Sequence, residues 1–238
     1  SMIGVSSIGM ILFTSRPVGD AMATTIWGAS SSWTLTALPL FVWMGEILFR
    51  TKLSENLFKG LAPWMQKLPG GLIHVNVVGC ALFAAISGSS AATVATVGKM
   101  SIPELRKRKY PEKILLGSLA GSGTLGLLIP PSIILIIYGV TVQESIAKLF
   151  IAGIIPGIMI ALIFMSYVII WSLMNKKSMP KSLENSSFIE KVKKSKQLMP
   201  VILLILAVIG SIYTGIATAT EAASLGVVGA LILSFFQK

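Results

Sequence analysis

The stretch Ser87-Gly88-Ser89-Ser90-Ala91-Ala92 lies in the middle of a long run without acidic or basic charges, which is bounded by Lys67 and Lys99. A single straight helix over residues 68–98 would be about 45 Å long at roughly 1.5 Å per residue, whereas the hydrocarbon core of a bilayer is about 30 Å thick. Two shorter helices, each about 20 Å long and folded back at the serine-rich turn, fit a bilayer better. Non-helical backbone at membrane depth is tolerated only where protein or a water-filled cavity satisfies its polar groups. The stretch therefore predicts a re-entrant helical hairpin over residues 70–100, a feature typical of transport proteins.

The composition indicates a membrane protein. Of the 238 residues, 54% are hydrophobic and only 12% are charged, and the mean hydropathy is +0.82. Soluble domains carry about 25% charged residues. The apolar runs are long, rich in Leu, Ile, Gly and Ala, and lack strand-like alternation, so they favour helices over a barrel. We expect an all-α integral membrane protein in which Cys80 and His74 are packed side chains.

The basic residues are concentrated between the apolar runs. Of the 20 Lys and Arg residues, 17 fall in three patches, at residues 50–67, 99–113 and 176–196. A net charge of +11 could suggest nucleic acid, but short basic loops beside apolar spans follow the positive-inside rule. We therefore expect these patches in the cytoplasm, a lipid bilayer around the spans, and no nucleic-acid partner. The same rule places Lys67 and the cluster at residues 106–109 on one side, as a hairpin requires and a single crossing does not.

The N-terminal run lacks the basic start and the cleavage pattern of a signal peptide. Because the chain begins and ends in short apolar runs, we expect it to be part of a longer transporter. Spans are expected at residues 2–14, 35–49, 198–214 and 221–236. Residues 50–68 form an amphipathic pattern, which suits either a helix in the plane of the interface or an ordinary connecting helix.

A second interrupted run covers residues 114–143. It contains Gly121-Ser122-Gly123-Thr124-Leu125-Gly126 and Ile129-Pro130-Pro131-Ser132. In a helix interior glycine costs about 1 kcal/mol and proline about 3 kcal/mol. The run therefore predicts a discontinuous helix: a half-helix, an unwound linker, and a second half-helix with Pro130 or Pro131 in its first turn.

The polar groups expected at membrane depth are hydroxyls and freed backbone carbonyls. Such oxygens suit a hard monovalent cation such as Na⁺, and half-helix N-termini suit anionic substrate groups. Small residues also permit close helix packing in lipid, but two consecutive interrupted helices favour a binding site. The hydroxyl groups in question belong to Ser87, Ser89, Ser90, Thr93, Ser122, Thr124 and Ser132.

The sequence does not predict an enzyme. Cys and His do not cluster as metal ligands, and the glycines near residue 121 are not followed by the lysine of a phosphate-binding motif. We therefore expect neither catalytic residues nor a cofactor. Glu46 and Glu221 are acids at the predicted span ends, where structural pairing, interface exposure and proton coupling are all open.

Several motifs, in this order along the chain, resemble the large membrane subunit of the TRAP (tripartite ATP-independent periplasmic) transporters. They are Ala37-Leu38-Pro39-Leu40-Phe41, Met44-Gly45-Glu46, the run at residues 87–93, the run at residues 121–126, Ile129-Pro130-Pro131-Ser132 and Thr220-Glu221-Ala222-Ala223. Ala219 departs from the pattern, because the family commonly has proline there. The family's second hairpin and second broken helix have no counterpart in this sequence.

The resemblance implies an elevator-type, Na⁺-coupled secondary transporter of the bacterial inner membrane, built from two inverted repeats. It would import a small organic acid, C4-dicarboxylate or sialic-acid-like, that a periplasmic binding protein delivers, and it would work with a small membrane subunit. The implied Na⁺ ligands lie among Ser87, Gly88, Ser89, Ser90, Gly121, Ser122, Gly123 and Thr124. The implied substrate contacts lie among Ser90, Ala91, Thr93, Pro130, Pro131 and Ser132.

The same resemblance divides the chain into five segments, which cover the first repeat and the start of the second. They are scaffold helices with an interfacial arm helix (1–68), the transport-domain hairpin and broken helix (69–143), a transmembrane helix (144–174) with a kink at Pro156-Gly157, a basic cytoplasmic linker (175–197), and further scaffold helices (198–238). Three alternatives stay open: a carboxylate carrier independent of a binding protein, a channel with re-entrant filter loops, and a purely structural membrane subunit.

Overall fold

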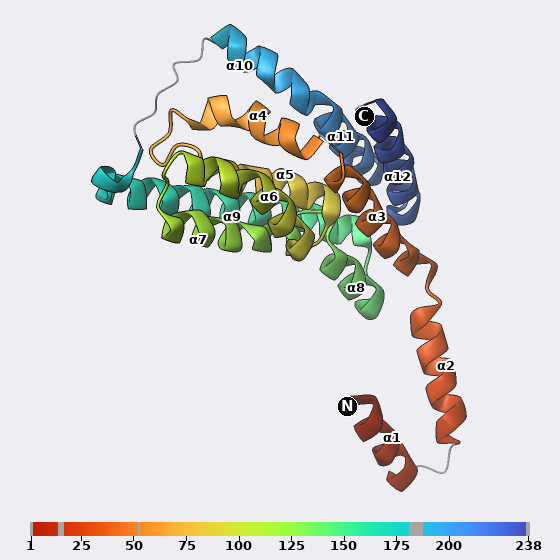
Figure 1. Cartoon of the computed structure of the whole chain (residues 1–238). Coiled ribbons are helices and arrows are strands. Elements are labelled where there is room, and N and C mark those ends of the chain that lie inside the picture. The colour runs from red at the N-terminus through yellow and green to blue at the C-terminus, as the bar shows by residue number, and fades with distance from the viewer. Residues whose placement is uncertain (1, 14–16, 52, 181–187, 237–238) are drawn as a thin grey trace.

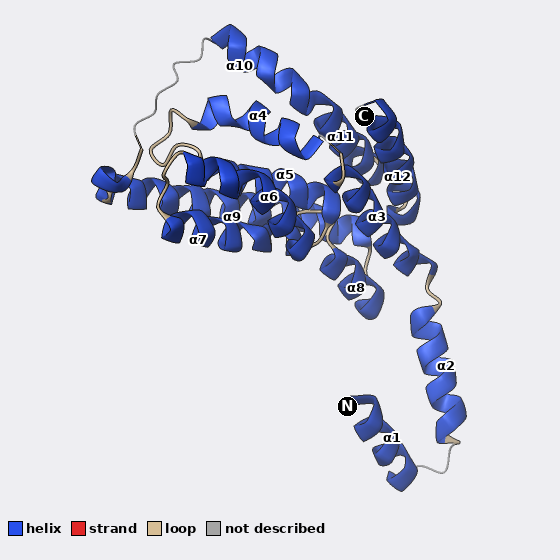
Figure 2. Ribbon diagram, in the orientation of Figure 1, coloured by secondary structure: helices blue, strands red, loops and turns tan. Residues whose placement is uncertain are grey.

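The computed structural model describes residues 2–13, 17–51, 53–180 and 188–236, and every regular element in these ranges is helical (Figure 2). The all-α prediction is therefore confirmed for the described residues. The elements, with η for a 3-10 helix, are α1 (Met2–Phe13), α2 (Val18–Ser30), η1 (Trp33–Thr36), α3 (Ala37–Phe49), α4 (Leu53–Met65), α5 (Ile73–Ser87), α6 (Ser90–Lys107), α7 (Glu112–Gly123), η2 (Thr124–Leu127), α8 (Ile133–Val142), α9 (Ile146–Met174), η3 (Lys176–Ser178), α10 (Phe188–Ser195), η4 (Lys196–Leu198), α11 (Met199–Tyr213) and α12 (Ala219–Phe236).

Helices α5 and α6 pack against each other as a helical hairpin. Gly88 ends α5 in the left-handed conformation, with φ 60°, which glycine adopts without steric cost. Ser89 follows in an extended conformation and caps α6, its side chain accepting a hydrogen bond from Ala92 N at 3.4 Å. The small-residue turn therefore folds as the sequence predicts, although α6 runs past residue 100 to Lys107 because its charged side chains stay at the surface while Ser101 and Leu105 are buried.

The hairpin forms the centre of the molecule (Figure 1). Helix α7 packs on both of its helices, and the long helix α9 lies along α5 and α7. Helix α4 covers another side and carries α10 on its outer surface. Helices α1 and α2 extend away from this body in Figure 1. The hairpin is thus enclosed by helices that come from both sides of it in the sequence.

Small residues bring α3 and α12 together at one end of the body. Ala222, Gly226 and Ala230 recur at intervals of four along α12 and are all buried. A Cβ on Gly226 would lie 2.5 Å from the Met44 sulfur of α3. This spacing is the small-residue pattern that lets helices approach closely in a membrane.

Two of the described helices are long and apolar enough to cross a bilayer: α9, with 29 residues and a mean hydropathy of 2.5, and α12, with 18 residues and 1.7. Residues 18–28 and 33–49, bent by 52°, would make a third if they act as one span. The spans expected at 2–14, 35–49 and 198–214 correspond to α1, α3 and α11, of 12, 13 and 15 residues. Each of these is shorter than the roughly 20 residues that a straight crossing requires.

The discontinuous helix is present, with one correction. Helix α7 ends at Gly123, η2 follows, and α8 begins at Ile133. The prediction that Pro130 or Pro131 lies in the first turn of the second half-helix is wrong, because Ser132 takes the extended N-cap conformation (φ −114°, ψ 129°) and leaves both prolines in the preceding turn. Around Pro156, α9 is a single helix from Ile146 to Met174. The linker expected at 175–197 includes η3, α10 and the first two residues of η4, while its residues 181–187 lie outside the described ranges.

The acids at the predicted span ends both have structural partners. Glu46 pairs with Arg50 at 2.7 Å on the surface of α3. Glu221 Oε2 accepts hydrogen bonds from Thr218 N and Thr218 Oγ1, both at 2.8 Å, and Glu221 N donates to Thr218 Oγ1 at 3.3 Å. This reciprocal arrangement is a capping box at the start of α12.

Replacing Glu221 by alanine is expected to lower the free energy of unfolding by about 1 kcal/mol, because it removes one half of this capping box. Chemical unfolding in detergent, followed by circular dichroism, measures the change. Glu221→Gln keeps an acceptor oxygen and should retain most of the stability. If the glutamine and alanine variants lose equal stability, the capping role is wrong.

Candidate functional site

The hairpin tip lies directly against the turn that precedes α8. Ile133 N donates to Gly88 O at 3.4 Å, and a Cβ on Gly88 would lie 2.5 Å from Pro131 O. The two interruptions predicted from sequence, one in each run, therefore meet in space. The contact depends on residue 88 having no side chain.

The 3-10 turn η2 contacts the same tip from a second direction. A Cβ on Gly126 would lie 2.8 Å from Ser90 N and 2.9 Å from Ser89 C. A Cβ on Gly123 would overlap the Val94 side chain of α6. Glycines three residues apart thus allow the break in the helix to lie on the backbone at the start of α6.

Helix α3 closes a third side of the tip. A Cβ on Gly45 would lie 2.9 Å from both Cα and Cβ of Ser87. The motif Met44-Gly45-Glu46 therefore has a packing role, in which glycine lets α3 approach the end of α5. The tip is held by α3, η2 and the turn before α8.

Three oxygens form a compact cluster inside the tip. Ser87 Oγ lies 3.0 Å from Thr93 Oγ1 and 3.4 Å from Ser89 O, and Thr93 Oγ1 donates to Ser89 O at 2.7 Å. Ser87 and Thr93 are buried, with exposed fractions of 1% and 0%. Nearby in sequence, Ser90 Oγ is buried without a hydrogen-bond partner. The cluster is made of neutral oxygens, the ligand type that suits a hard cation.

The predicted Na⁺ residues of the broken helix do not all face this cluster. Ser122 is buried against α5, where its hydroxyl donates to Ser118 O and lies 3.4 Å from Asn76 O, about 16 Å along α5 from Ser87. Gly121 faces Phe164 of α9, with Cβ contacts from 3.4 Å. Thr124 is exposed and donates to Gly121 O at 2.7 Å. Gly123 contacts α6, at the Val94 side chain.

The predicted substrate residues lie at or beside the tip. Ala91 is exposed at the start of α6. Pro130, Pro131 and Ser132 are buried in the turn before α8, where Ser132 Oγ donates to Leu127 O. Pro130 also packs towards α9, since a Cβ on Gly153 would lie 3.5 Å from Pro130 Cγ. The structure therefore places Pro131 against Gly88 of the tip and leaves Ala91 exposed.

Three residues with a role at this site were not among the sequence-predicted ones: Gly45, Gly126 and Gly153. Gly45 and Gly126 lie inside motifs quoted from the sequence, whereas Gly153 lies in a plain apolar run that gives no such signal. Cys80 and His74 are buried as expected, and His74 Nε2 lies 2.8 Å from Pro69 O. Among the described residues, no group of three or more His, Cys, Asp and Glu side chains could hold a metal ion.

The full length of the chain, residues 1–238, matches the family model for the tripartite ATP-independent periplasmic transporter, DctM component. The chain belongs to this family. TRAP permeases are membrane-embedded transporter components and not enzymes, in agreement with the sequence-based expectation and with the apolar helices of the structure.

Relatives with different named substrates have similar identities to this TRAP permease chain. The C4-dicarboxylate TRAP transporter large permease protein of Pseudomonas aeruginosa is 34% identical over 98% of this chain and 54% of its own length. The sialic acid TRAP transporter large permease protein of Vibrio cholerae is 35% identical over 98% and 54%. The isethionate TRAP transporter permease protein DctMQ of Oleidesulfovibrio alaskensis is 33% identical over 98% and 36%. The chain thus spans about half the length of the first two of these curated relatives and 36% of the third.

Proposed function

We propose that this chain forms part of the membrane subunit of a Na⁺-coupled secondary transporter that imports small organic acids. The observation that carries the proposal is the contact between the hairpin tip and the break in the neighbouring helix, through Gly88 and Gly126. The polar groups of unwound backbone in the interior of a membrane protein need partners, and an ion bound at a broken helix would be a partner for the carbonyls.

In this proposal the oxygens of Ser87 and Ser89 supply part of the Na⁺ site. Thr93, which the family resemblance implies as a substrate contact, is proposed as a Na⁺ ligand instead, because its hydroxyl lies within 3.0 Å of Ser87 Oγ and Ser89 O. Mutual distances of 2.7–3.4 Å already gather these three neutral oxygens at one point. The carboxylate of the substrate would lie next to the tip, near Ser90 and the N-terminus of α8, whose dipole favours negative charge. The remaining Na⁺ ligands would come from the freed carbonyls of the break at residues 121–127.

The hairpin and broken helix, residues 69–143, would act as a mobile transport domain that slides against a scaffold. Residues 1–68 and 198–238 would belong to that scaffold, with α4 as a helix in the membrane plane. Family membership supports this arrangement, and so does the length of α5: at 1.5 Å per residue its 15 residues span only about 22 Å, less than the bilayer core. The three basic patches would face the cytoplasm, with the chain in the bacterial inner membrane.

The substrate is proposed to be a C4-dicarboxylate or a sialic-acid-like acid, because relatives named for these compounds are 34% and 35% identical to the chain. A periplasmic binding protein would deliver it and a small membrane subunit would complete the scaffold. No cofactor other than the coupling Na⁺ is part of the proposal.

Uptake into proteoliposomes tests the proposal. A complete permease that contains these 238 residues is reconstituted with its small membrane subunit, and labelled dicarboxylate or sialic acid is offered under an inward Na⁺ or K⁺ gradient, with and without the binding protein. We expect uptake only when both Na⁺ and the binding protein are present. Uptake without the binding protein would favour a carrier that binds substrate directly, and ion current without substrate would favour a channel.

A further inference from the structure

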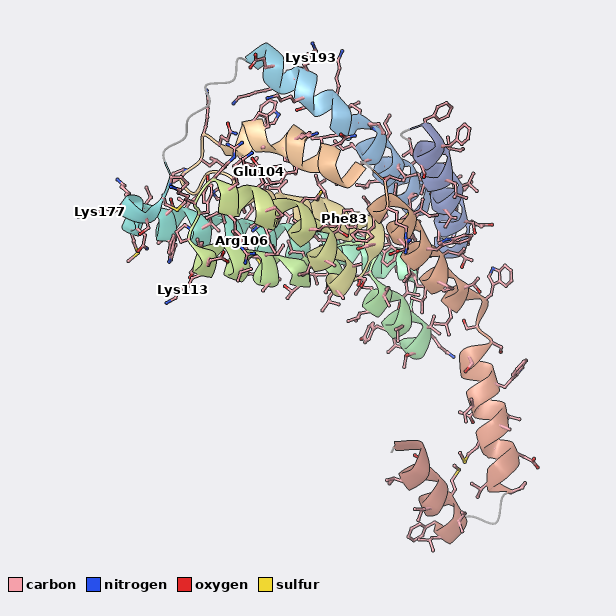
Figure 3. All side chains as sticks on the ribbon, viewed as in Figure 1. Phe83, Glu104, Arg106, Lys113, Lys177 and Lys193 are labelled. Atoms are coloured by element: carbon pink, nitrogen blue, oxygen red, sulfur yellow. The ribbon has the colours of Figure 1, made fainter. Side chains whose placement is uncertain are left out.

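A cavity of about 800 Å³ lies at the end of the hairpin opposite its tip. Its walls come from three segments: residues 66–72, which lead into α5; residues 104–110, which end α6 and lead to α7; and residues 172–180, at the end of α9. Figure 3 shows Glu104 and Lys177 towards this end of the body and Phe83 towards the other. The cavity is therefore separate from the proposed transport site.

The cavity is strongly basic. Lys67, Lys107, Arg108, Lys109 and Lys176 line it, against one acid, Glu104. Glu104 Oε1 accepts a hydrogen bond from Arg108 Nε at 2.8 Å, so the charges of these two side chains neutralise each other. The four lysines make no ion pair with any residue in the described ranges. The cavity thus gathers positive charges that the described protein does not neutralise.

The backbone at Lys109 is unusual for a lysine. Its φ of 61° is left-handed, and Lys109 N and Tyr110 N donate to Arg106 O and Leu105 O at 2.9 and 3.1 Å. This is a helix end at which glycine is strongly preferred, so lysine at this position is disfavoured by the local backbone. Arg106, three residues before Lys109, forms an ion pair with Glu112 at 2.7 Å. A lysine held in a disfavoured conformation at the wall of a cavity suggests a functional role.

A protonated phenol also faces the cavity. Tyr110 lines it, and its oxygen accepts a hydrogen bond from Leu72 N at 3.1 Å. Burial raises the pKa of Tyr110, so the phenol keeps its proton and has an O–H group available to donate. Leu68 and Leu173 provide apolar lining beside the charges.

We propose that this cavity binds a phosphate-bearing anion. Lysine ammonium groups bind phosphate as point charges, and the Tyr110 hydroxyl adds a neutral donor. The lysines suit the phosphate of an anionic phospholipid headgroup and the apolar lining beside them suits the first carbons of its acyl chains, while free inorganic phosphate presents the same chemistry to the lysines. A bound anion would join the entrance of the hairpin, the α6–α7 connection and the end of α9.

The test measures binding to a complete permease that contains these 238 residues, purified in a neutral detergent, by native mass spectrometry and by titration, in two separate arms. One arm uses short-chain phosphatidylglycerol and the other inorganic phosphate. Lys107→Gln combined with Lys176→Gln removes two lining charges, and we expect it to weaken binding by about fivefold for each lysine. Lys113→Gln combined with Lys177→Gln removes the same net charge from exposed residues that do not line the cavity, and it should leave binding within twofold.

Lys109→Gly distinguishes loss of the charge from misfolding, because it removes a lining charge while glycine suits the left-handed backbone at this position better than lysine does. It should weaken binding about fivefold while the midpoint of thermal unfolding stays constant or rises. Saturation at one phosphatidylglycerol, without saturation by phosphate, supports the site with a phospholipid as its ligand. Saturation by phosphate with the same variant pattern supports it with the free anion. Equal weakening by the two double variants, or no saturation in either arm, overturns the proposal.

Discussion

Replacing Gly88 by alanine is expected to reduce Na⁺-driven uptake at least tenfold and to lower the free energy of unfolding by about 2–4 kcal/mol. Two separate penalties add. The left-handed backbone at φ 60° disfavours any side chain, and the new Cβ would lie 2.5 Å from Pro131 O, a backbone atom that cannot rotate away. The tip would then shift away from the turn before α8, and the proposed site would lose its geometry.

The matched control is Gly117→Ala on α7. Nothing lies within 4 Å of a Cβ on Gly117, and alanine in a helix interior stabilises by roughly 0.5–1 kcal/mol relative to glycine. Uptake by reconstituted permease and unfolding in detergent are measured for both variants. If Gly88→Ala behaves like Gly117→Ala in both measurements, the contact between the hairpin tip and Pro131 does not exist in the working protein.

The hairpin and the broken helix could be predicted from sequence because they depend on local features. Gly88 with its serine neighbours specifies a chain reversal, and the glycines and prolines at residues 121–131 cannot sustain a helix. The capping box at Thr218 and Glu221 was equally readable, since a threonine followed three residues later by glutamate is its sequence signature. Structural pairing of Glu221 is among the alternatives open from the sequence, but Thr218 is not named there as its partner.

The contacts of the tip could not be predicted in the same way. Gly45, Gly126 and Gly153 matter because a particular neighbour lies within about 3 Å of where their Cβ would be, and that neighbour is distant in sequence. A sequence likewise does not show in which direction a hydroxyl side chain points. Ser122 and Thr124 looked equivalent to Ser87 and Thr93, but the helical turn directs one towards α5 and leaves the other at the surface. Residue type predicted the kind of site, while only the fold decides which oxygens meet.

Thr93→Val is expected to raise the Na⁺ concentration for half-maximal uptake about tenfold, which corresponds to roughly 1.4 kcal/mol of lost binding. Valine keeps the branched shape of threonine and replaces its hydroxyl with a methyl group. Thr93 Oγ1 lies within 3.0 Å of both other oxygens of the cluster, Ser87 Oγ and Ser89 O, so its loss removes one proposed ligand and the contact that orders the other two. Uptake is measured as a function of Na⁺ at saturating substrate.

Thr96→Val separates ion binding from helix stability. Thr96 lies almost one turn further along α6, is also buried, and donates to Ala92 O at 2.7 Å, as Thr93 does to Ser89 O. Both variants lose the same kind of bond to the preceding turn, but only Thr93 shares its oxygen with Ser87. The Na⁺ dependence should therefore shift for Thr93→Val alone, with similar unfolding midpoints for both. Equal Na⁺ dependence in the two variants would exclude the oxygen cluster as a coupling site and leave it as a structural feature of the hairpin turn.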